Sequence, residues 1–282
     1  MKRRRLHKNS NGKRGAPLGQ HFLTSTAIAS AVAAAGSVME HDEVLEIGPG
    51  RGILTEALLK KGARVTAVEK DPAMIEILKR EFAREIKNKT LVLHEQDIRD
   101  LLKAKSLHLQ DPYKVIANIP YYITGELIRL FLTAEKQPAV IAFLVQKEVA
   151  ERIVGNSKKE SILSLSVKVF GTPRYVKTVK RGSFSPAPSV DSAILSITDI
   201  SRKNFTPIYG CSAEELRERE KIFFKVVKAG FAQKRKTLAG NLKRVFGERA
   251  LGAMKKLNIP EKIRAEDVPL PQWLSLAESF MT

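Results

Sequence analysis

Val44-Leu45-Glu46-Ile47-Gly48-Pro49-Gly50-Arg51-Gly52 joins a short apolar run to three glycines at alternate positions. Helix-period sequence follows at 53–61, so we expect the chain to turn sharply from a buried strand into a helix. In open α/β sheets such a turn lies at the carboxyl ends of the strands, where ligands bind. The segment therefore predicts an α/β domain with a ligand site at residues 48–52.

Apolar runs and helix-period stretches alternate along the first two thirds of the 282-residue chain. We expect strands at 44–47, 64–69, 91–95, 114–117 and 140–145, and helices at 53–61, 72–82, 125–131 and near 161–170. An earlier helix is expected within 27–38, with Ile28, Val32, Ala35 and Met39 on one face, and two closing strands at 174–179 and 191–197. This alternation is typical of a Rossmann-like sheet with helices on both faces. The pattern beyond residue 199 predicts a small C-terminal helical domain.

Charge is distributed unevenly along the chain. Residues 1–14 and 199–282 each carry a net charge of +7, whereas residues 15–198 contribute only +5 of the total of +19. We interpret this as a basic N-terminal tail, a nearly balanced enzyme body at 15–198 and a C-terminal domain at 199–282. The two basic ends are expected to bind a polyanion. Basic ends that only keep the protein in solution are the alternative.

Cys211 is the only cysteine, so neither a disulfide within the chain nor a cysteine-based metal site is available. A reducing cytoplasm suits this composition, and we expect no bound metal. No apolar segment reaches transmembrane length, and the run at 27–38 lies too far from the basic start to be a signal sequence. We therefore expect a cytoplasmic protein without a membrane partner, and a monomer.

The glycine spacing indicates the kind of cofactor. Gly48, Gly50 and Gly52 form G-x-G-x-G, unlike the G-x-G-x-x-G of dinucleotide enzymes, whose helix N-terminus holds a pyrophosphate. S-adenosylmethionine carries no phosphate and suits this spacing. The next strand ends in Glu69, whose carboxylate is placed to accept both ribose hydroxyls. A plain strand-to-helix turn and a solvated acid are the alternatives.

Asp97 follows the third expected strand, with Ile98 directly after it. We expect the Asp97 carboxylate to accept a hydrogen bond from the amino group of the cofactor's adenine, and Ile98 to form an apolar wall beside that ring. The alternative is that Asp97 caps the next helix.

Asn118-Ile119-Pro120-Tyr121, after the fourth strand, is the most informative tetrapeptide. An adenine amine is a weak nucleophile, and the Asn118 side-chain carbonyl together with the Ile119 backbone carbonyl can accept its two N–H groups. Pro120 stiffens the turn, and Tyr121 offers a ring for an extruded base to stack on. The tetrapeptide predicts methyl transfer by positioning, with no general base. A strand-ending turn without chemistry is the alternative.

Several segments in this order resemble the KsgA family of ribosomal RNA adenine dimethyltransferases, over nearly the whole chain after residue 15. They are Leu18-Gly19-Gln20-His21-Phe22-Leu23, the glycine loop, Glu69, Asp97, the Asn118 tetrapeptide, Phe184-Ser185-Pro186-Ala187-Pro188-Ser189-Val190-Asp191-Ser192 and Phe231-Ala232-Gln233-Lys234-Arg235-Lys236. The resemblance implies that His21 and Leu23 touch the cofactor, together with Gly48, Gly50, Glu69, Asp97, Ile98 and Asn118. It also implies that Phe184 faces the target base opposite Tyr121. His21 replaces the Asn common at its position in the family, so its polar contact is left open.

The resemblance also bears on the substrate. Erythromycin-resistance methyltransferases of large-subunit RNA share the N-I-P-Y form, so the tetrapeptide does not separate the two groups. Residues 190–192 and 231–236 look like the small-subunit group, which dimethylates two adjacent adenines near the 3′ end of 16S-type RNA. We then expect a basic helix that binds phosphates through Lys234, Arg235 and Lys236. The partner is expected to be small-subunit RNA, either free or within an assembling small subunit.

Two rival functions follow from the same residues. A DNA adenine methyltransferase uses the same amine, and methyl labelling of separate nucleic acids would distinguish it. A binding protein that keeps the fold without the chemistry is disfavoured, because Asn118, Pro120 and Tyr121 are intact.

Overall fold

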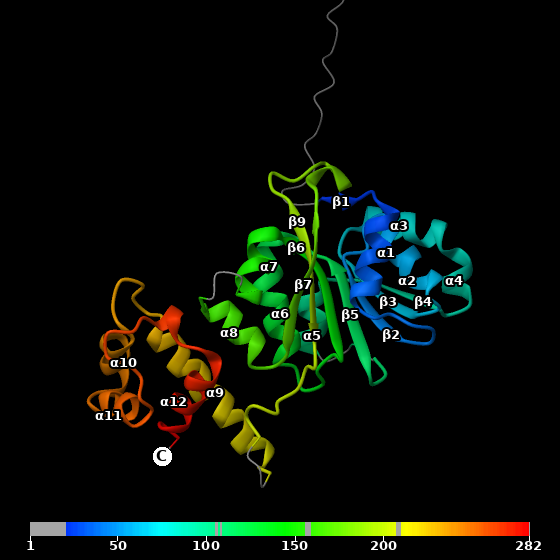
Figure 1. Cartoon of the computed structure of the whole chain (residues 1–282). Helices are drawn as coiled ribbons and strands as arrows, with labels where there is room; N and C mark the ends of the chain where they lie inside the picture. The colour runs from blue at the N-terminus through cyan, green and yellow to red at the C-terminus, as the bar shows by residue number, and fades with distance from the viewer. Residues whose placement is uncertain (1–20, 105–106, 108, 156–158, 207–209, 282) are drawn as a thin grey trace, which may run out of the picture.

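The computed structural model describes residues 21–104, 107, 109–155, 159–206 and 210–281. Most of the expected segments lie in this part, but the basic tail at 1–14 lies outside the described residues. Figure 1 shows a sheet-centred body that carries β1 at its upper end and a group of C-terminal helices at its side. In the described part, no helix is long and apolar enough to cross a membrane.

A seven-stranded sheet in the order β4-β3-β2-β5-β6-β9-β7 forms the centre. Its strands are β2 (Glu43–Ile47), β3 (Arg64–Glu69), β4 (Leu91–Glu95), β5 (Tyr113–Asn118), β6 (Val140–Gln146), β7 (Thr172–Val179) and β9 (Ser192–Thr198). The five strands from β4 to β6 are parallel, β9 is antiparallel to β6, and β7 is antiparallel to β9. The expected strands are confirmed, with ends that differ by at most two residues.

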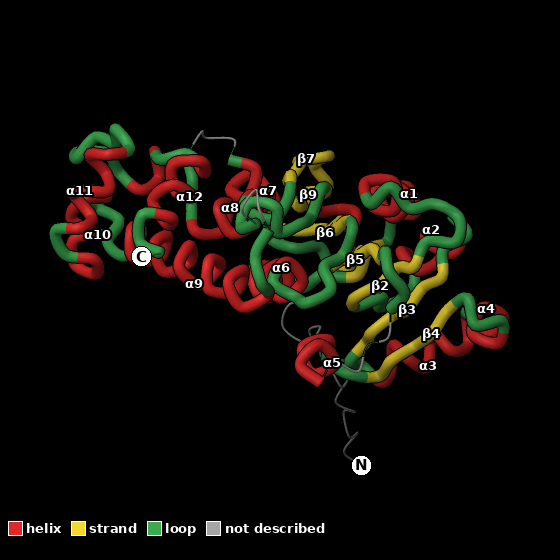
Figure 2. Tube along the Cα trace, turned by 90° about the horizontal axis from the view of Figure 1, so that it is seen from below, coloured by secondary structure: helices red, strands yellow, loops and turns green. Residues whose placement is uncertain are grey.

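Helices cover both faces of this sheet, as the Rossmann-like prediction requires (Figure 2). One face carries α1 (Thr26–Ala35), α2 (Ile53–Lys60) and α4 (Ala83–Lys87), which share one apolar cluster with the sheet. Helix α3 (Pro72–Glu81) lies beside the start of α2, because a Cβ atom at Gly52 would lie 3.0 Å from the Leu78 side chain. The other face carries α5 (Ile98–Ala104), α6 (Thr124–Leu132), α7 (Lys147–Val154) and α8 (Ile162–Lys168). Strand residues with aliphatic side chains point alternately to the two clusters, so the sheet is buried on both sides.

The helix that the sequence predicts within 27–38 ends earlier than expected. Helix α1 ends at Ala35, and Met39 is 66% exposed instead of sharing the buried face of Ile28 and Val32. The reason is Gly36, where a Cβ atom would lie 2.3 Å from the Ile116 side chain. The chain passes so close to β5 there that the helix stops and turns.

The sequence analysis did not predict two strands of two residues each. Strand β1 (Phe22–Leu23) pairs antiparallel with β8 (Phe184–Ser185), so that Leu23 lies opposite Phe184. The Thr24 amide also donates to the Ser183 carbonyl at 2.9 Å. Strands this short show no periodicity, and only the folded chain brings their residues together.

The C-terminal helices are α9 (Ala213–Gly230), α10 (Leu238–Phe246), α11 (Arg249–Lys256) and α12 (Leu270–Glu278). Phe170, after α8, contacts Phe205 and Phe224, and Phe205 contacts Phe223 in α9. The apolar cluster beneath the sheet therefore continues into these helices without a break. The domain boundary near residue 199 stays a prediction. It lies where the sheet-centred body and the C-terminal helices pack against each other.

The expected basic helix at Lys234, Arg235 and Lys236 is wrong. Helix α9 ends at Gly230, and these three exposed residues lie in the loop before α10. A Cβ atom at Gly230 would lie 2.3 Å from Trp273, so the chain packs tightly there and the helix ends. Thr237 then starts α10 by accepting from the Gly240 amide. Figure 1 shows that α9 climbs from the lower end of the molecule and leaves this loop at the upper end of the C-terminal helices.

Candidate active site

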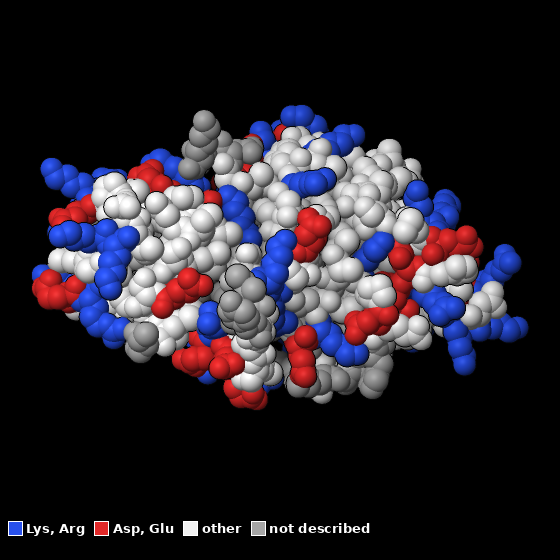
Figure 3. Space-filling view, turned by 60° about the horizontal axis from the view of Figure 1, so that its bottom comes forward, with Lys and Arg blue, Asp and Glu red and all other residues white. Residues whose placement is uncertain are grey.

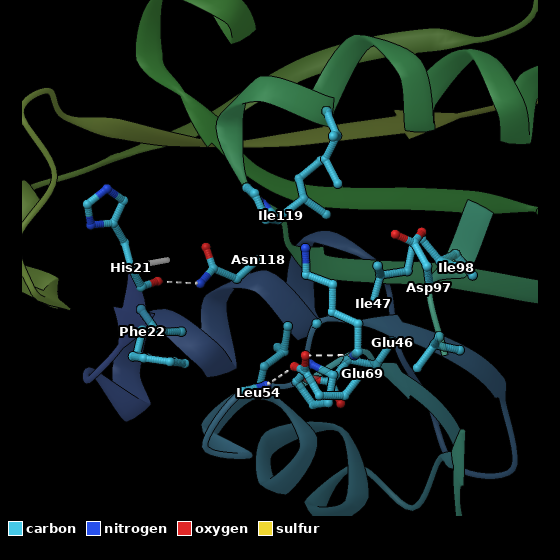
Figure 4. Close-up of a pocket in the computed structure, with 18 of the residues that line it drawn as sticks. His21, Phe22, Glu46, Ile47, Leu54, Glu69, Asp97, Ile98, Asn118 and Ile119 are labelled. Carbon is cyan, nitrogen blue, oxygen red and sulfur yellow. Dashed lines mark hydrogen bonds between the residues drawn. The ribbon is translucent and has the colours of Figure 1, made fainter. Parts of the chain in front are cut away.

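A cavity of about 1040 Å³, including its open mouth, lies at the carboxyl ends of β2, β3 and β5. Figure 4 shows His21 and Asn118 at one end, Asp97 and Ile98 at the other, and Glu69 between them. All cofactor-binding and tetrapeptide residues that the sequence predicted line it: His21, Leu23, Gly48, Gly50, Glu69, Asp97, Ile98, Asn118, Ile119, Pro120 and Tyr121.

The glycine loop forms one wall of this cavity in a conformation that other residues avoid. Gly48, Gly50 and Gly52 have φ angles of +64°, +56° and +83°, in the left-handed region that only glycine adopts without strain. A Cβ atom at Gly50 would also lie 2.9 Å from the Phe22 ring. The loop therefore depends on glycine for both its turn and its close approach to β1.

Glu69 is fixed by backbone amides. Its Oε2 accepts from the Gly50 amide at 3.2 Å, and its Oε1 accepts from the amides of Lys70 and Asp71 at 2.8 and 3.0 Å. The side chain is buried at the end of β3 and lines the cavity. The carboxylate thus links the glycine loop to the next strand, and its remaining lone pairs are available to a ligand's hydroxyl groups.

Asp97 is both a helix cap and half of an ion pair. Its Oδ1 accepts from the Arg99 amide at 2.9 Å, as a cap does at the start of α5, and from Arg99 Nε at 3.0 Å. Its Oδ2 accepts from the second guanidinium nitrogen at 2.6 Å. These hydrogen bonds from Arg99 lower the pKa of Asp97 to about 2. Because Asp97 stays ionised, it can only accept, as contact with an adenine amine requires.

Asn118 holds its side chain in a defined direction at the other end of the cavity. Its Nδ2 donates to the His21 carbonyl at 3.1 Å (Figure 4). No hydrogen bond to its Oδ1 is found within the part of the chain that the structure describes. The anchored nitrogen therefore leaves a directed carbonyl as an acceptor in the cavity.

Tyr121 lies beside Asn118, in the 3-10 turn Tyr121–Ile123 that Pro120 precedes. Its hydroxyl is 2.6 Å from Ser192 Oγ at the start of β9, and its ring centroid is 5.9 Å from that of His21. The His21 ring nitrogen Nδ1 is in turn 2.9 Å from the Pro186 carbonyl oxygen. The half-buried Tyr121 ring is thus held in place from two sides. Burial raises the pKa of its hydroxyl, so the ring stays neutral.

The structure does not bring Phe184 to the cavity. Its side chain is 5% exposed, lies in β8 opposite Leu23, and belongs to the apolar cluster on the α1 side. The two-residue strand pairing accounts for this position, because it turns the ring towards the core.

The sequence analysis did not assign several residues that line the cavity, among them Glu46, Arg99 and Tyr122. Glu46 is fully buried, accepts from the Thr55 hydroxyl at 2.7 Å, and has an Oε1 without a partner in the described part of the chain. Burial raises the pKa of its carboxyl to about 8, the Thr55 hydrogen bond opposes this, and nearby Glu69 adds to it. The signal in the sequence that could have revealed Glu46 is an acidic residue inside an otherwise apolar strand.

The fold and the cavity together define a class: a Rossmann-like methyltransferase that acts on an amine. The glycine loop and two carboxylates line one elongated cavity, and the Asn118 carbonyl lies at its far end, where a target amine would meet a methyl donor.

Comparison with known proteins identifies the family within this class. The family model described as ribosomal RNA adenine dimethylase matches residues 11–282, so the chain belongs to this family and is a ribosomal RNA adenine dimethyltransferase. A relative from Dehalococcoides mccartyi, named ribosomal RNA small subunit methyltransferase A, is 38% identical over 93% of this chain and 87% of its own length.

Solved structures show the same fold. A dimethyladenosine transferase from Plasmodium falciparum is 26% identical, with a TM-score of 0.72 over 91% of this chain and 96% of its own. The 23S rRNA methyltransferase ErmE is 24% identical, with a TM-score of 0.70 over 93% of this chain and 100% of its own. The likeness to ErmE shows the fold alone.

Proposed function

We propose that this enzyme dimethylates the 6-amino groups of two adjacent adenosines near the 3′ end of small-subunit ribosomal RNA, with S-adenosylmethionine as methyl donor. The observation that carries this proposal is the position of Asn118, which lines the cavity while its Nδ2 is held by the His21 carbonyl. The name of the Dehalococcoides mccartyi relative supports the choice of the small subunit.

The residues present fit the proposed donor. The three glycines of the loop at 48–52 have no side chains to fill the cavity, Glu69 is placed for ribose hydroxyls, and ionised Asp97 is placed for an adenine amine. When bound, S-adenosylmethionine supplies an electrophilic methyl group on a sulfonium.

The chain's own residues position the target amine. Asn118 Oδ1 and the Ile119 carbonyl accept its two N–H groups, which directs the nitrogen lone pair towards the donor. Tyr121 stacks on the extruded base. The methylated nitrogen is acidic enough to lose its proton without a side chain acting as a base, so positioning provides most of the rate enhancement.

Incubation of the protein with methyl-labelled donor and separate pools of small-subunit RNA, large-subunit RNA and duplex DNA tests the proposal. We expect label as dimethyladenosine in the small-subunit pool alone, and much slower labelling with an Asn118→Ala variant. Label in the large-subunit pool or in DNA would overturn the substrate assignment. The same assay with free RNA and with an assembling small subunit would identify the form of the substrate.

A further inference from the structure

The outer strand β7 contains one bulge that changes the direction of its side chains. Tyr175 pairs with Leu195 and Lys177 pairs with Ile194, so Val176 is an additional residue between them. Side chains alternate along a regular strand, which would point Arg174 and Lys177 to opposite faces. The bulge places these two cations on the same face.

That face is the one covered by α1. Arg174 lies opposite Ser196, whose hydroxyl donates to the Ala35 carbonyl of α1, and Lys177 lies opposite Ile194, which belongs to the α1-side cluster. Helix α1 packs over β6 and β9, and β9 is the strand next to β7. Arg174 and Lys177 are both exposed beside it.

The row of cations leads towards the active site. Because β7 and β6 are both antiparallel to β9, β7 runs parallel to the central strands and ends at the same carboxyl edge as Asn118. Arg181 follows two residues after the strand and is exposed. The Ser183 carbonyl is then bonded to Thr24, beside β1 and the cavity.

These cations also lack local neutralisation. Residues 161–190 hold five Lys and Arg residues and no Asp or Glu. Lys168 pairs with Glu160 and Lys180 pairs with Asp191. Within the described ranges, no ion pair involves Arg174, Lys177 or Arg181. By contrast, Figure 3 shows basic and acidic side chains interspersed over the face turned towards the viewer.

We propose that Arg174, Lys177 and Arg181 form a phosphate-binding row that holds the RNA backbone next to the target adenines. This inference rests on the proposed function, and it assigns RNA contact to the enzyme body itself. Phosphate contacts fix register and orientation without reading sequence, which is what an enzyme needs to present one base to its cavity. The competing role for cations on an edge strand is protection against pairing with another chain.

The test neutralises Arg174 and Lys177 together, as Arg174→Gln/Lys177→Gln, and leaves the bulge intact. The matched control is Arg84→Gln/Lys87→Gln in α4, which makes the same charge change next to the opposite sheet edge, where both residues are also exposed. Binding of a transcript of the 3′ end of small-subunit RNA is measured across a range of salt concentrations. Binding of S-adenosylhomocysteine by calorimetry reports on the integrity of the cavity.

Two lost phosphate contacts should flatten the logarithmic salt dependence by about 1.4 to 1.8. The control should keep the parental slope, and both variants should bind S-adenosylhomocysteine as the parent does. An unchanged slope in the β7 variant overturns the inference, and aggregation with unchanged RNA binding overturns it in favour of edge protection. If the slope flattens but the parent does not methylate this transcript, the phosphate row stands and the proposed function fails.

Discussion

Asn118 is the residue on which the proposed chemistry depends most directly. We expect Asn118→Ala to lower the single-turnover methylation rate by roughly 100-fold to 1000-fold, the effect typical of losing one directed hydrogen-bond partner of a reacting group. Affinities for RNA and S-adenosylhomocysteine, measured separately, should change much less. A nearly normal rate at saturating donor would remove Asn118 from the catalytic machinery.

Glu69 should contribute to binding rather than to rate. Glu69→Gln keeps the shape of the side chain but removes the charge of a residue expected to bind ribose, and such hydrogen bonds contribute about 1.5 to 3 kcal/mol. Calorimetry should therefore show at least roughly tenfold weaker binding of S-adenosylhomocysteine. Glu95→Gln is the matched control, because Glu95 ends the adjacent strand opposite Glu69 and is exposed outside the cavity. Equal affinities for the two variants would contradict the assignment.

Glu46 should make stability depend on pH. Its pKa is raised from 4.5 to about 8, so the folded state keeps a proton that the unfolded chain releases between these values. The contribution of Glu46 to the free energy of unfolding is therefore largest below pH 4.5 and falls as pH rises through this window. Glu46→Gln cannot ionise, so thermal denaturation should show it more stable than the parent at pH 8 and similar at pH 5. A constant difference across the window would show that Glu46 is ionised throughout.

At the scale of elements, the pairing of β8 with β1 buries Phe184, so we expect this residue to stabilise the fold. Phe184→Ala removes a buried ring opposite Leu23 and should destabilise the protein by about 3 to 5 kcal/mol, measured by chemical denaturation. Phe184→Leu should recover most of that stability. If Phe184→Leu also methylates RNA normally, the ring serves packing alone, whereas a folded variant that cannot methylate would place Phe184 at the target base.

The loop between α9 and α10 gives a second prediction at this scale. Lys234, Arg235 and Lys236 are exposed on the short connection between α9 and α10. Replacing all three with Gln should flatten the salt dependence of RNA binding by somewhat under one unit for each phosphate contact that is lost. An unaltered slope would show that the loop is an ordinary solvated surface.

At the scale of the whole molecule, the C-terminal helices are packed too firmly to be removed as a test of RNA binding. The cluster of Phe170, Phe205 and Phe223 crosses the joint, and Arg202 connects Glu220 of α9 to the carbonyls of Thr133 and Ala134 at the end of α6. Truncation would expose this core, so charge substitutions on the surface distinguish RNA contact from folding more clearly.

The sequence by itself determined the sheet, the glycine loop and most residues of the cavity. Strands β2, β3, β5 and β6 are buried on both faces and therefore read as apolar runs, and Gly48, Gly50 and Gly52 follow from the turn that the chain must make. Glu69, Asp97 and Asn118 each end or follow a strand of one parallel sheet. Chain order and strand direction are enough to bring such residues to one edge.

Only the tertiary structure decided what happens where distant segments meet. The pairing of β1 with β8 buries Phe184, Trp273 packed against Gly230 ends α9 before Lys234, and the bulge at Val176 redirects β7. None of these features has a local pattern, because each depends on contacts between residues far apart in the chain or between neighbouring strands. Local periodicity reports which face of an element is buried, and the packing of one element against another decides where that element stops and which way its last side chains point.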